Sequence, residues 1–214
     1  MTPKTIKQKT DGVGLEEVGT VNIVLSLCDK TGNILKPWAQ TGKYRCIAVD
    51  IQHEGIKIID GIEYTHGDVR EYLPPNGSYS FACAFPPCTH LAVSGARWFR
   101  TKGLGALKEA IEIVQACEKI VMWTGAPFFI ENPVSTLSTY WRPPDYTFDP
   151  CDYGDSYTKK TCLWTNDKFN MPKKNRVEPT EGSKMHLLPP SKNRAELRSI
   201  TPMGFSNAVF LAHN

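Results

Sequence analysis

Cys88 is the residue whose setting most suggests covalent chemistry. It follows two prolines in Phe85-Pro-Pro-Cys-Thr89, directly after an apolar, β-rich run. The prolines hold the backbone rigid, and a thiolate aimed into a cleft would be a nucleophile if a cation or helix terminus assisted it. Two other interpretations stay open. A single loop cysteine can be just a small buried residue, and Cys83 and His90 lie nearby, although their spacing fits no zinc pattern.

A glutamate follows another apolar run, in Glu131-Asn132-Pro133. A carboxyl group at a strand end in an apolar setting needs a polar partner, and in a cleft its raised pKa would let it deliver a proton. The alternative is an ordinary turn, because Asn-Pro also begins turns.

A glycine and two acids, Asp29 and Asp50, follow other apolar runs. Gly32 would let the backbone approach a cofactor closely, and Asp50 could accept hydrogen bonds from the hydroxyls of a ribose. The loop does not match G-x-G-x-x-G, because Lys30 stands where nucleotide-binding loops often have glycine. Asp68 is a further candidate acid, with a surface turn as its alternative.

Strands and helices must position these side chains. Apolar runs predict strands at 21–28, 45–50, 78–84, 127–130 and 160–164, with helices at 34–40, 102–120, 193–198 and 202–212. Residues 140–150 read as a loop and 166–190 as irregular. The clearest helix is 102–120, with an apolar face formed by Leu104, Leu107, Ile111, Val114 and Cys117. This alternation predicts an α/β fold with a mostly parallel sheet, in which ligands lie beyond the carboxyl ends of the strands.

Composition indicates an ordinary globular protein. The 214 residues are 41% hydrophobic and 22% charged, with a net charge of +3, which argues against disorder. No apolar run reaches membrane-spanning length, and the first ten residues lack the apolar core of a secretory signal, so we expect a cytoplasmic protein without membrane contact. Seven irregularly spaced cysteines favour reduced thiols.

The charge is unevenly distributed. Residues 1–158 carry 15 basic and 18 acidic side chains, whereas residues 159–198 carry 10 basic and 4 acidic ones. A basic strip on a nearly neutral body suggests contact with phosphates. A solvated, lysine-rich loop is the alternative.

The order of these pieces resembles the DNA cytosine-5 methyltransferases, especially the short forms of phage and bacterial genomes. The pieces are the glycine turn, Asp50, Gly67-Asp68, Pro-Pro-Cys88, Glu131-Asn-Pro, Tyr153-Gly-x-x-x-x-Lys159 and Gly204-Phe-Ser-Asn-Ala-Val. The resemblance runs from about Val21 to the C-terminus. It implies a Rossmann-like, S-adenosylmethionine-dependent methyltransferase fold in a bacterial or phage-infected cell.

The resemblance also implies catalytic roles. Cys88 would attack C6 of a flipped cytosine in DNA, and Glu131 would protonate or hydrogen-bond N3 so that C5 becomes nucleophilic. Asn132 would hold the loop, and Lys159 would replace an arginine that helps to hold the catalytic loop and the target base. No metal is implied.

S-adenosylmethionine is the cofactor that the resemblance implies. Thr31 and Gly32 would belong to the loop that runs past the methionine moiety. Asp50 would bind the ribose, and Ile51 would lie beside the adenine. The remaining expected cofactor contacts are Cys28 in the first loop, Asp68 and Val69 at the adenine edge, Pro86 at the sulfonium, and Asn207 and Ala208 on a returning helix.

The expected organisation is an arm (1–20), a catalytic and cofactor-binding domain (21–165), a basic irregular insert (166–200) and a C-terminal helix (201–214). The insert is short for a target recognition domain, which is minimal or absent, so we expect low sequence specificity on DNA. Two alternatives remain. The same fold could act on RNA or a free cytosine nucleotide or transfer another group, or the protein could bind nucleic acid or a partner without catalysis. The pattern predicts no oligomeric state.

Overall fold

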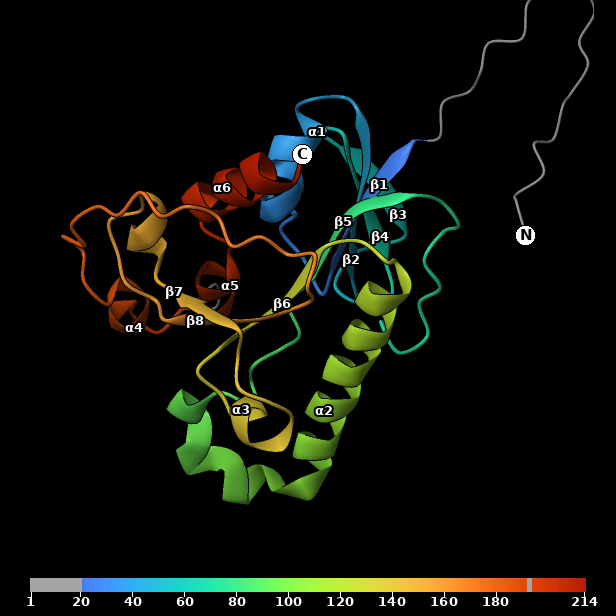
Figure 1. The fold of residues 1–214 in the computed structure, drawn as a ribbon. Coiled ribbons are helices and arrows are strands. Elements are labelled where there is room, and N and C mark those ends of the chain that lie inside the picture. Colours follow the sequence, from blue (N-terminus) through green and yellow to red (C-terminus); the bar gives the residue numbers. More distant parts are fainter. Residues whose placement is uncertain (1–20, 192–193) are drawn as a thin grey trace, which may run out of the picture.

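The computed structural model describes residues 21–191 and 194–214 and centres on one sheet (Figure 1). The expected arm, residues 1–20, lies outside the described residues. The sheet has eight strands in the order β3-β4-β2-β1-β5-β6-β8-β7. They are β1 (Asn22–Leu27), β2 (Tyr44–Asp50), β3 (Ile56–Ile59), β4 (Ile62–His66), β5 (Tyr79–Ala84), β6 (Phe128–Pro133), β7 (Tyr146–Phe148) and β8 (Thr161–Thr165).

The five central strands, β4, β2, β1, β5 and β6, run parallel to one another. In β1 and β2 five consecutive residues are buried, because helices and loops cover both faces of the sheet. This confirms the prediction of an α/β fold with a mostly parallel sheet.

Both edges contain strands that the sequence analysis did not predict. β3 and β4 form an antiparallel hairpin whose turn, Asp60-Gly61, has positive φ at both residues. Asp-Gly is favoured in such turns, so a sequence signal was present, but β3 is exposed along its whole length and shows no alternation. At the other edge β7 lies within 140–150, so the prediction of a loop was wrong there.

Short helices connect the strands, and α2 is the one long helix of the described residues. Among these residues no helix is long and apolar enough to cross a membrane. The region 166–190 is irregular as predicted except for α4. The helices are η1 (Asn33–Leu35), α1 (Lys36–Ala39), η2 (Val93–Trp98), α2 (Phe99–Trp123), α3 (Leu137–Tyr140), η3 (Pro150–Tyr153), α4 (Lys184–Leu187), α5 (Arg194–Ser199) and α6 (Met203–His213).

Helix α2 is broken near its start. Gly103 has φ 73° and ψ −177°, which is not helical and which only glycine adopts without strain. The break changes the direction of the residues before it, and Leu104 is 83% exposed. The prediction that Leu104 shares the apolar face was therefore wrong, whereas Val114 and Cys117 are buried as expected.

Helices pack on both faces of the sheet (Figure 1). α2 covers one face, where Val114 and Cys117 join the main apolar cluster. α1 and α6 cover the other, where Trp38 stacks on Phe81 with 5.3 Å between ring centroids. α6 docks so closely that a Cβ at Gly204 would lie 1.9 Å from the Tyr153 carbonyl oxygen.

Candidate active site

The sheet has a reversal point between β1 and β5. From β1 the chain moves outward to β2 and β4, and β5 then lies on the other side of β1. In such sheets a ligand crevice opens beyond the carboxyl ends of the strands flanking the reversal. The loop after β1 (28–33) and the loop after β5 (85–89) leave these two ends.

Asp29, which follows the first strand as expected, organises the loop after β1. Its buried carboxylate accepts hydrogen bonds from Ser26 Oγ at 2.7 Å and from the backbone nitrogens of Thr31 and Gly32 at 3.1 and 2.8 Å. Burial raises the pKa of Asp29 and these bonds oppose the rise. An aspartate that accepts from backbone two residues on is a known turn signal, so the sequence contained the clue.

Gly32 is required where this loop meets β4. It has φ 62°, and a Cβ there would lie 2.6 Å from Tyr64 Oη. That hydroxyl donates a hydrogen bond to the Thr31 carbonyl at 3.2 Å. Because Tyr64 belongs to the hairpin that was not predicted, sequence reasoning missed its role.

Asp50 ends β2 and is only 7% exposed. Its Oδ1 accepts a hydrogen bond from the backbone nitrogen of Gln52 at 2.8 Å. The next residue, Ile51, is exposed. A buried carboxylate and an exposed apolar side chain therefore stand together at the end of this strand.

Cys28 lies near both expected acids. Contact with Cys117 and burial raise the pKa of Cys28, and the charges of Asp50 and Asp68 raise it further. The Asp68 carboxylate is bound by Arg70, which lowers its pKa. Val69, the neighbour of Asp68, packs in the main apolar cluster.

The loop after β5 presents Cys88 from a tied backbone. Asn132 Nδ2 donates a hydrogen bond to the buried Pro86 carbonyl at 3.0 Å, which ties β6 to this loop. The Cys88 carbonyl accepts hydrogen bonds from the backbone nitrogens of Leu91 and Ala92 at 3.0 and 2.8 Å. Burial and the charge of Glu131 raise the pKa of the Cys88 thiol, whereas Lys159 and Arg198 lower it.

Glu131 and Lys159 line one small pocket. Burial raises the pKa of Glu131, and the charge of Lys159 opposes that rise. The pocket has a volume of about 10 Å³, close to the ~10–15 Å³ that one water needs. Its other lining residues are Phe85, Phe148, Thr161, Ser199, Thr201, Pro202 and Phe205.

Lys159 is placed by a loop that the sequence analysis left without structure. Its backbone nitrogen donates a hydrogen bond to Asp149 Oδ1 at 2.8 Å. Asp149 also begins η3, where its backbone nitrogen donates to Asp152 Oδ2 at 3.1 Å. The cation therefore reaches Glu131 because a capped turn holds the chain beside it.

Helix α5, which belongs to the basic insert (166–200), covers the site. Lys30 of the first loop forms an ion pair with Glu196 at 3.0 Å, and Ser199 lines the pocket of Glu131. Arg198 lies close enough to lower the pKa of Cys88. Sequence reasoning did not select Arg198, because no local pattern links it to Cys88.

Helix α6 returns to the first loop, but not through the expected side chains. Asn207 is exposed and Ala208 packs against the second apolar cluster, that of Trp38 and Phe81. The segment just before α6 also contacts the loop, through a hydrogen bond from Asn33 Nδ2 to the Thr201 carbonyl at 3.2 Å.

Part of the basic strip serves the fold. Lys174 and Arg176 both form ion pairs with the buried Asp152, and Lys168 Nζ donates to the Gly125 carbonyl at 2.6 Å. Lys184 pairs with Glu181 at 2.7 Å. These four cations therefore have partners within the protein, and phosphate contact by the basic strip stays a prediction.

Asp152→Ala should detach this segment from η3. Burial raises the pKa of Asp152, but hydrogen bonds from the Asp149 backbone, Lys174 and Arg176 outweigh burial, so the pKa is lowered. The ionised form thus stabilises the fold above the ordinary value of 3.8, and this is lost as pH falls through the lowered pKa. We expect a loss of about 1–3 kcal/mol at pH 7 that shrinks towards pH 3. Urea unfolding of both proteins at the two pH values measures it, and an equal loss at both would contradict the electrostatic cause.

Comparisons with known proteins add little to this geometry. No family model and no curated protein match the chain. A solved structure from E. coli, described as a proposed DNA modification methyltransferase encoded within a prophage, matches with a TM-score of 0.44 and 13% identity. The match covers 66% of this chain and 45% of that chain, so it spans less than half of that protein.

Proposed function

We propose that this protein transfers a methyl group from S-adenosylmethionine to C5 of cytosine in DNA. The observation that carries the proposal is the proximity of three groups: Glu131 of β6 and Lys159 line one pocket, and the charges of both act on the thiol of Cys88 in the loop after β5. A thiol, a carboxyl group with a raised pKa and a cation are the groups that addition to a pyrimidine ring needs.

The end of β2 fits the cofactor. The Asp50 carboxylate can accept hydrogen bonds from ribose hydroxyls. Ile51 offers an exposed apolar surface to the adenine. When bound, S-adenosylmethionine would supply an electrophilic methyl group.

The chain's own residues then perform addition and elimination. The Cys88 thiolate bonds to C6 of cytosine while Glu131 gives its proton to N3, which leaves C5 electron-rich. After C5 has taken the methyl group, a base removes the C5 proton, the S–C6 bond breaks to release the thiolate, the C5–C6 double bond returns and N3 gives its proton back to Glu131. Lys159 favours the thiolate through its charge.

Helix α5 must move before a base enters. A pocket of about 10 Å³ admits no pyrimidine ring, and Ser199 of α5 is part of its wall. The Lys30–Glu196 pair that joins α5 to the first loop is partly exposed. Such pairs contribute only about 0–1 kcal/mol to stability, so breaking this pair to move α5 costs little free energy.

Transfer of labelled methyl groups tests the proposal. The purified protein is given S-adenosylmethionine with a labelled methyl group and cytosine-containing DNA, RNA or dCMP, and products are identified by mass spectrometry. We expect 5-methylcytosine in DNA. Label in RNA or dCMP alone selects the alternative acceptors, and calorimetry that shows no cofactor binding favours a non-catalytic binding protein.

A further inference from the structure

A second cavity lies beside the catalytic loop and is far larger than the pocket of Glu131. It measures about 310 Å³ and is lined by residues of the start of α2, by Thr136 and Tyr140 of the α3 region, and by His90. Figure 1 shows α3 beside the start of α2. Phe99, Leu107 and Tyr140 supply apolar wall, and His90, Arg100 and Lys102 supply polar groups. The proposed reaction uses none of these residues.

The cavity depends on the break in α2. Gly103 lines it and has the φ and ψ that end the helical path between Lys102 and Leu104. A continuous helix would carry residues 99–102 in another direction. The glycine therefore shapes the wall in which Arg100 and Lys102 stand.

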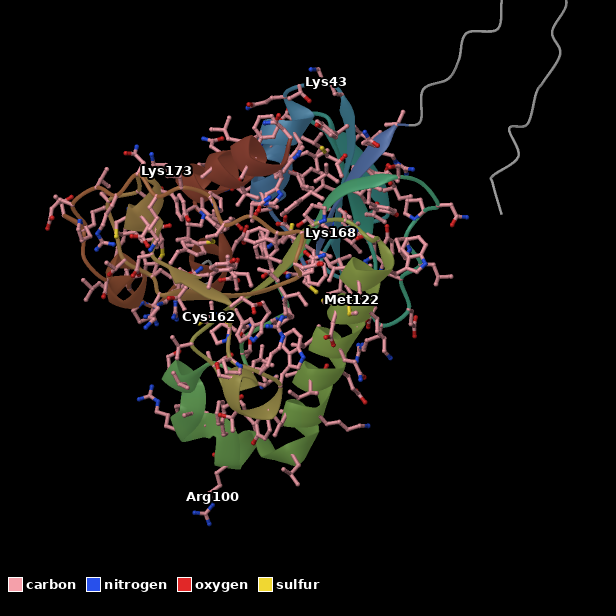
Figure 2. All side chains as sticks on the ribbon, in the orientation of Figure 1. Lys43, Arg100, Met122, Cys162, Lys168 and Lys173 are labelled. Carbon is pink, nitrogen blue, oxygen red and sulfur yellow. The ribbon has the colours of Figure 1, made fainter. Side chains whose placement is uncertain are left out.

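Two cationic side chains, Arg100 and Lys102, line this cavity, and no aspartate or glutamate among the described residues does. No aspartate or glutamate stands between Glu71 and Glu109 in the sequence, whereas Arg97, Arg100 and Lys102 all do. The Arg100 side chain extends from the tip of the molecule, away from its body (Figure 2). Cations without acidic partners in the same segment favour a negatively charged ligand.

Exposed rings accompany these cations. Tyr140 is 61% exposed at the cavity and Trp98 is 52% exposed beside it. The Arg97 guanidinium lies 5.1 Å from the centre of the Trp98 ring. Interleaved cations and exposed aromatic rings are the combination with which proteins hold unpaired bases, by stacking on the bases and by contacting phosphates.

The cavity shares a wall with the catalytic loop. His90 stands two residues after Cys88, and its buried Nδ1 has no hydrogen-bond partner among the described residues. Lys102 Nζ donates a hydrogen bond to the Thr89 carbonyl at 2.6 Å. A nucleotide in the cavity would therefore lie close to a nucleotide at Cys88 on the same strand.

We propose that this cavity binds an unpaired nucleotide of single-stranded nucleic acid next to the nucleotide that reacts. The identity of that reacting neighbour rests on the proposed function, whereas strand binding does not. A duplex is the poorer ligand, because its base faces are already stacked and cannot reach Phe99 and Tyr140. Single-stranded DNA and RNA share the required phosphates and unstacked bases.

Fluorescence anisotropy with labelled oligothymidylate tests this. The probe has no cytosine and is used without cofactor, so binding is independent of methyl transfer. The double variant Arg100→Ala/Tyr140→Ala should bind about tenfold or more weakly, since stacking and one phosphate contact are lost. The slope of log K against log salt should fall by about 0.7.

Matched controls and further probes complete the test. Lys108→Ala and Trp123→Ala remove an exposed cation and an exposed ring elsewhere on α2 and should change affinity less than about twofold. Oligouridylate distinguishes RNA from DNA, and a blunt duplex of equal length should bind more weakly. Equal affinity of wild type and double variant, preference for the duplex, or binding only to vesicles containing phosphatidylserine would each overturn the inference. Intact strand binding without methyl transfer would instead refute only the proposed function.

Discussion

Cys88→Ala should reduce methyl transfer to cytosine to background, a loss on the order of 10⁴-fold or more, because the reaction then has no nucleophile for C6. Cys88 is the cysteine that the loop after β5 presents near Glu131. Burial and the charge of Glu131 raise the pKa of its thiol, and the charges of Lys159 and Arg198 only partly oppose that rise. Incorporation of labelled methyl groups into DNA measures the loss. Full activity in the variant would exclude the covalent mechanism.

A mechanism-based trap separates chemistry from folding. With 5-fluorocytosine in the DNA, the C5 position carries no proton to remove, so the S–C6 bond cannot break and a covalent complex should survive denaturing electrophoresis. Wild type should form this complex and Cys88→Ala should not. Cys46→Ala is the control, because Cys46 is buried on β2 away from the pocket and should retain the trap.

Glu131→Gln should lower kcat by about 10²–10⁴-fold, the usual contribution of a positioned general acid. The amide keeps the shape of the side chain but has no acidic proton to give to N3. Cofactor affinity should be unchanged, since Glu131 lies with Lys159 and not with Asp50. Single-turnover rates together with calorimetry distinguish this result from general damage to the site.

The same substitution should stabilise the fold as pH rises. Burial raises the pKa of Glu131 in the folded protein above its ordinary value of 4.5, so folding favours the protonated form. Below pH 4.5 Glu131 is protonated in the folded and the unfolded protein, so its burial carries no cost for a charge. As pH rises from 4.5 through the raised pKa, the stability of the wild-type fold falls, because the buried carboxylate becomes charged. Glu131→Gln should therefore exceed wild type in free energy of unfolding at pH 8 but not at pH 4. Urea unfolding at both pH values measures this, and identical differences would contradict it.

The sequence alone predicted the strands whose side chains are buried on both faces of the sheet. β1 and β5 read as apolar runs, and Asp29, Asp50 and Cys88 lie at or just after strand ends as expected. Glu131 was expected to follow its strand, but β6 continues to Pro133 by pairing with β8, so Glu131 lies within the strand. Short or exposed elements gave no such pattern, so β3 and β7 were missed. The Asp60-Gly61 turn was readable, because only a few residue types favour two successive positive φ values.

Local pattern was enough to select Cys88, Glu131 and the first loop as candidates, since the order of motifs along the chain is a property of neighbouring residues. Only the tertiary structure decided which charges surround them. Arg198 reaches Cys88 from 110 residues away in the chain, and Lys159 reaches Glu131 through the turn capped by Asp149. It also decided that Asp152 takes Lys174 and Arg176 from the basic strip. Ion pairs and cavities depend on distances between segments remote in sequence, and packing sets those distances.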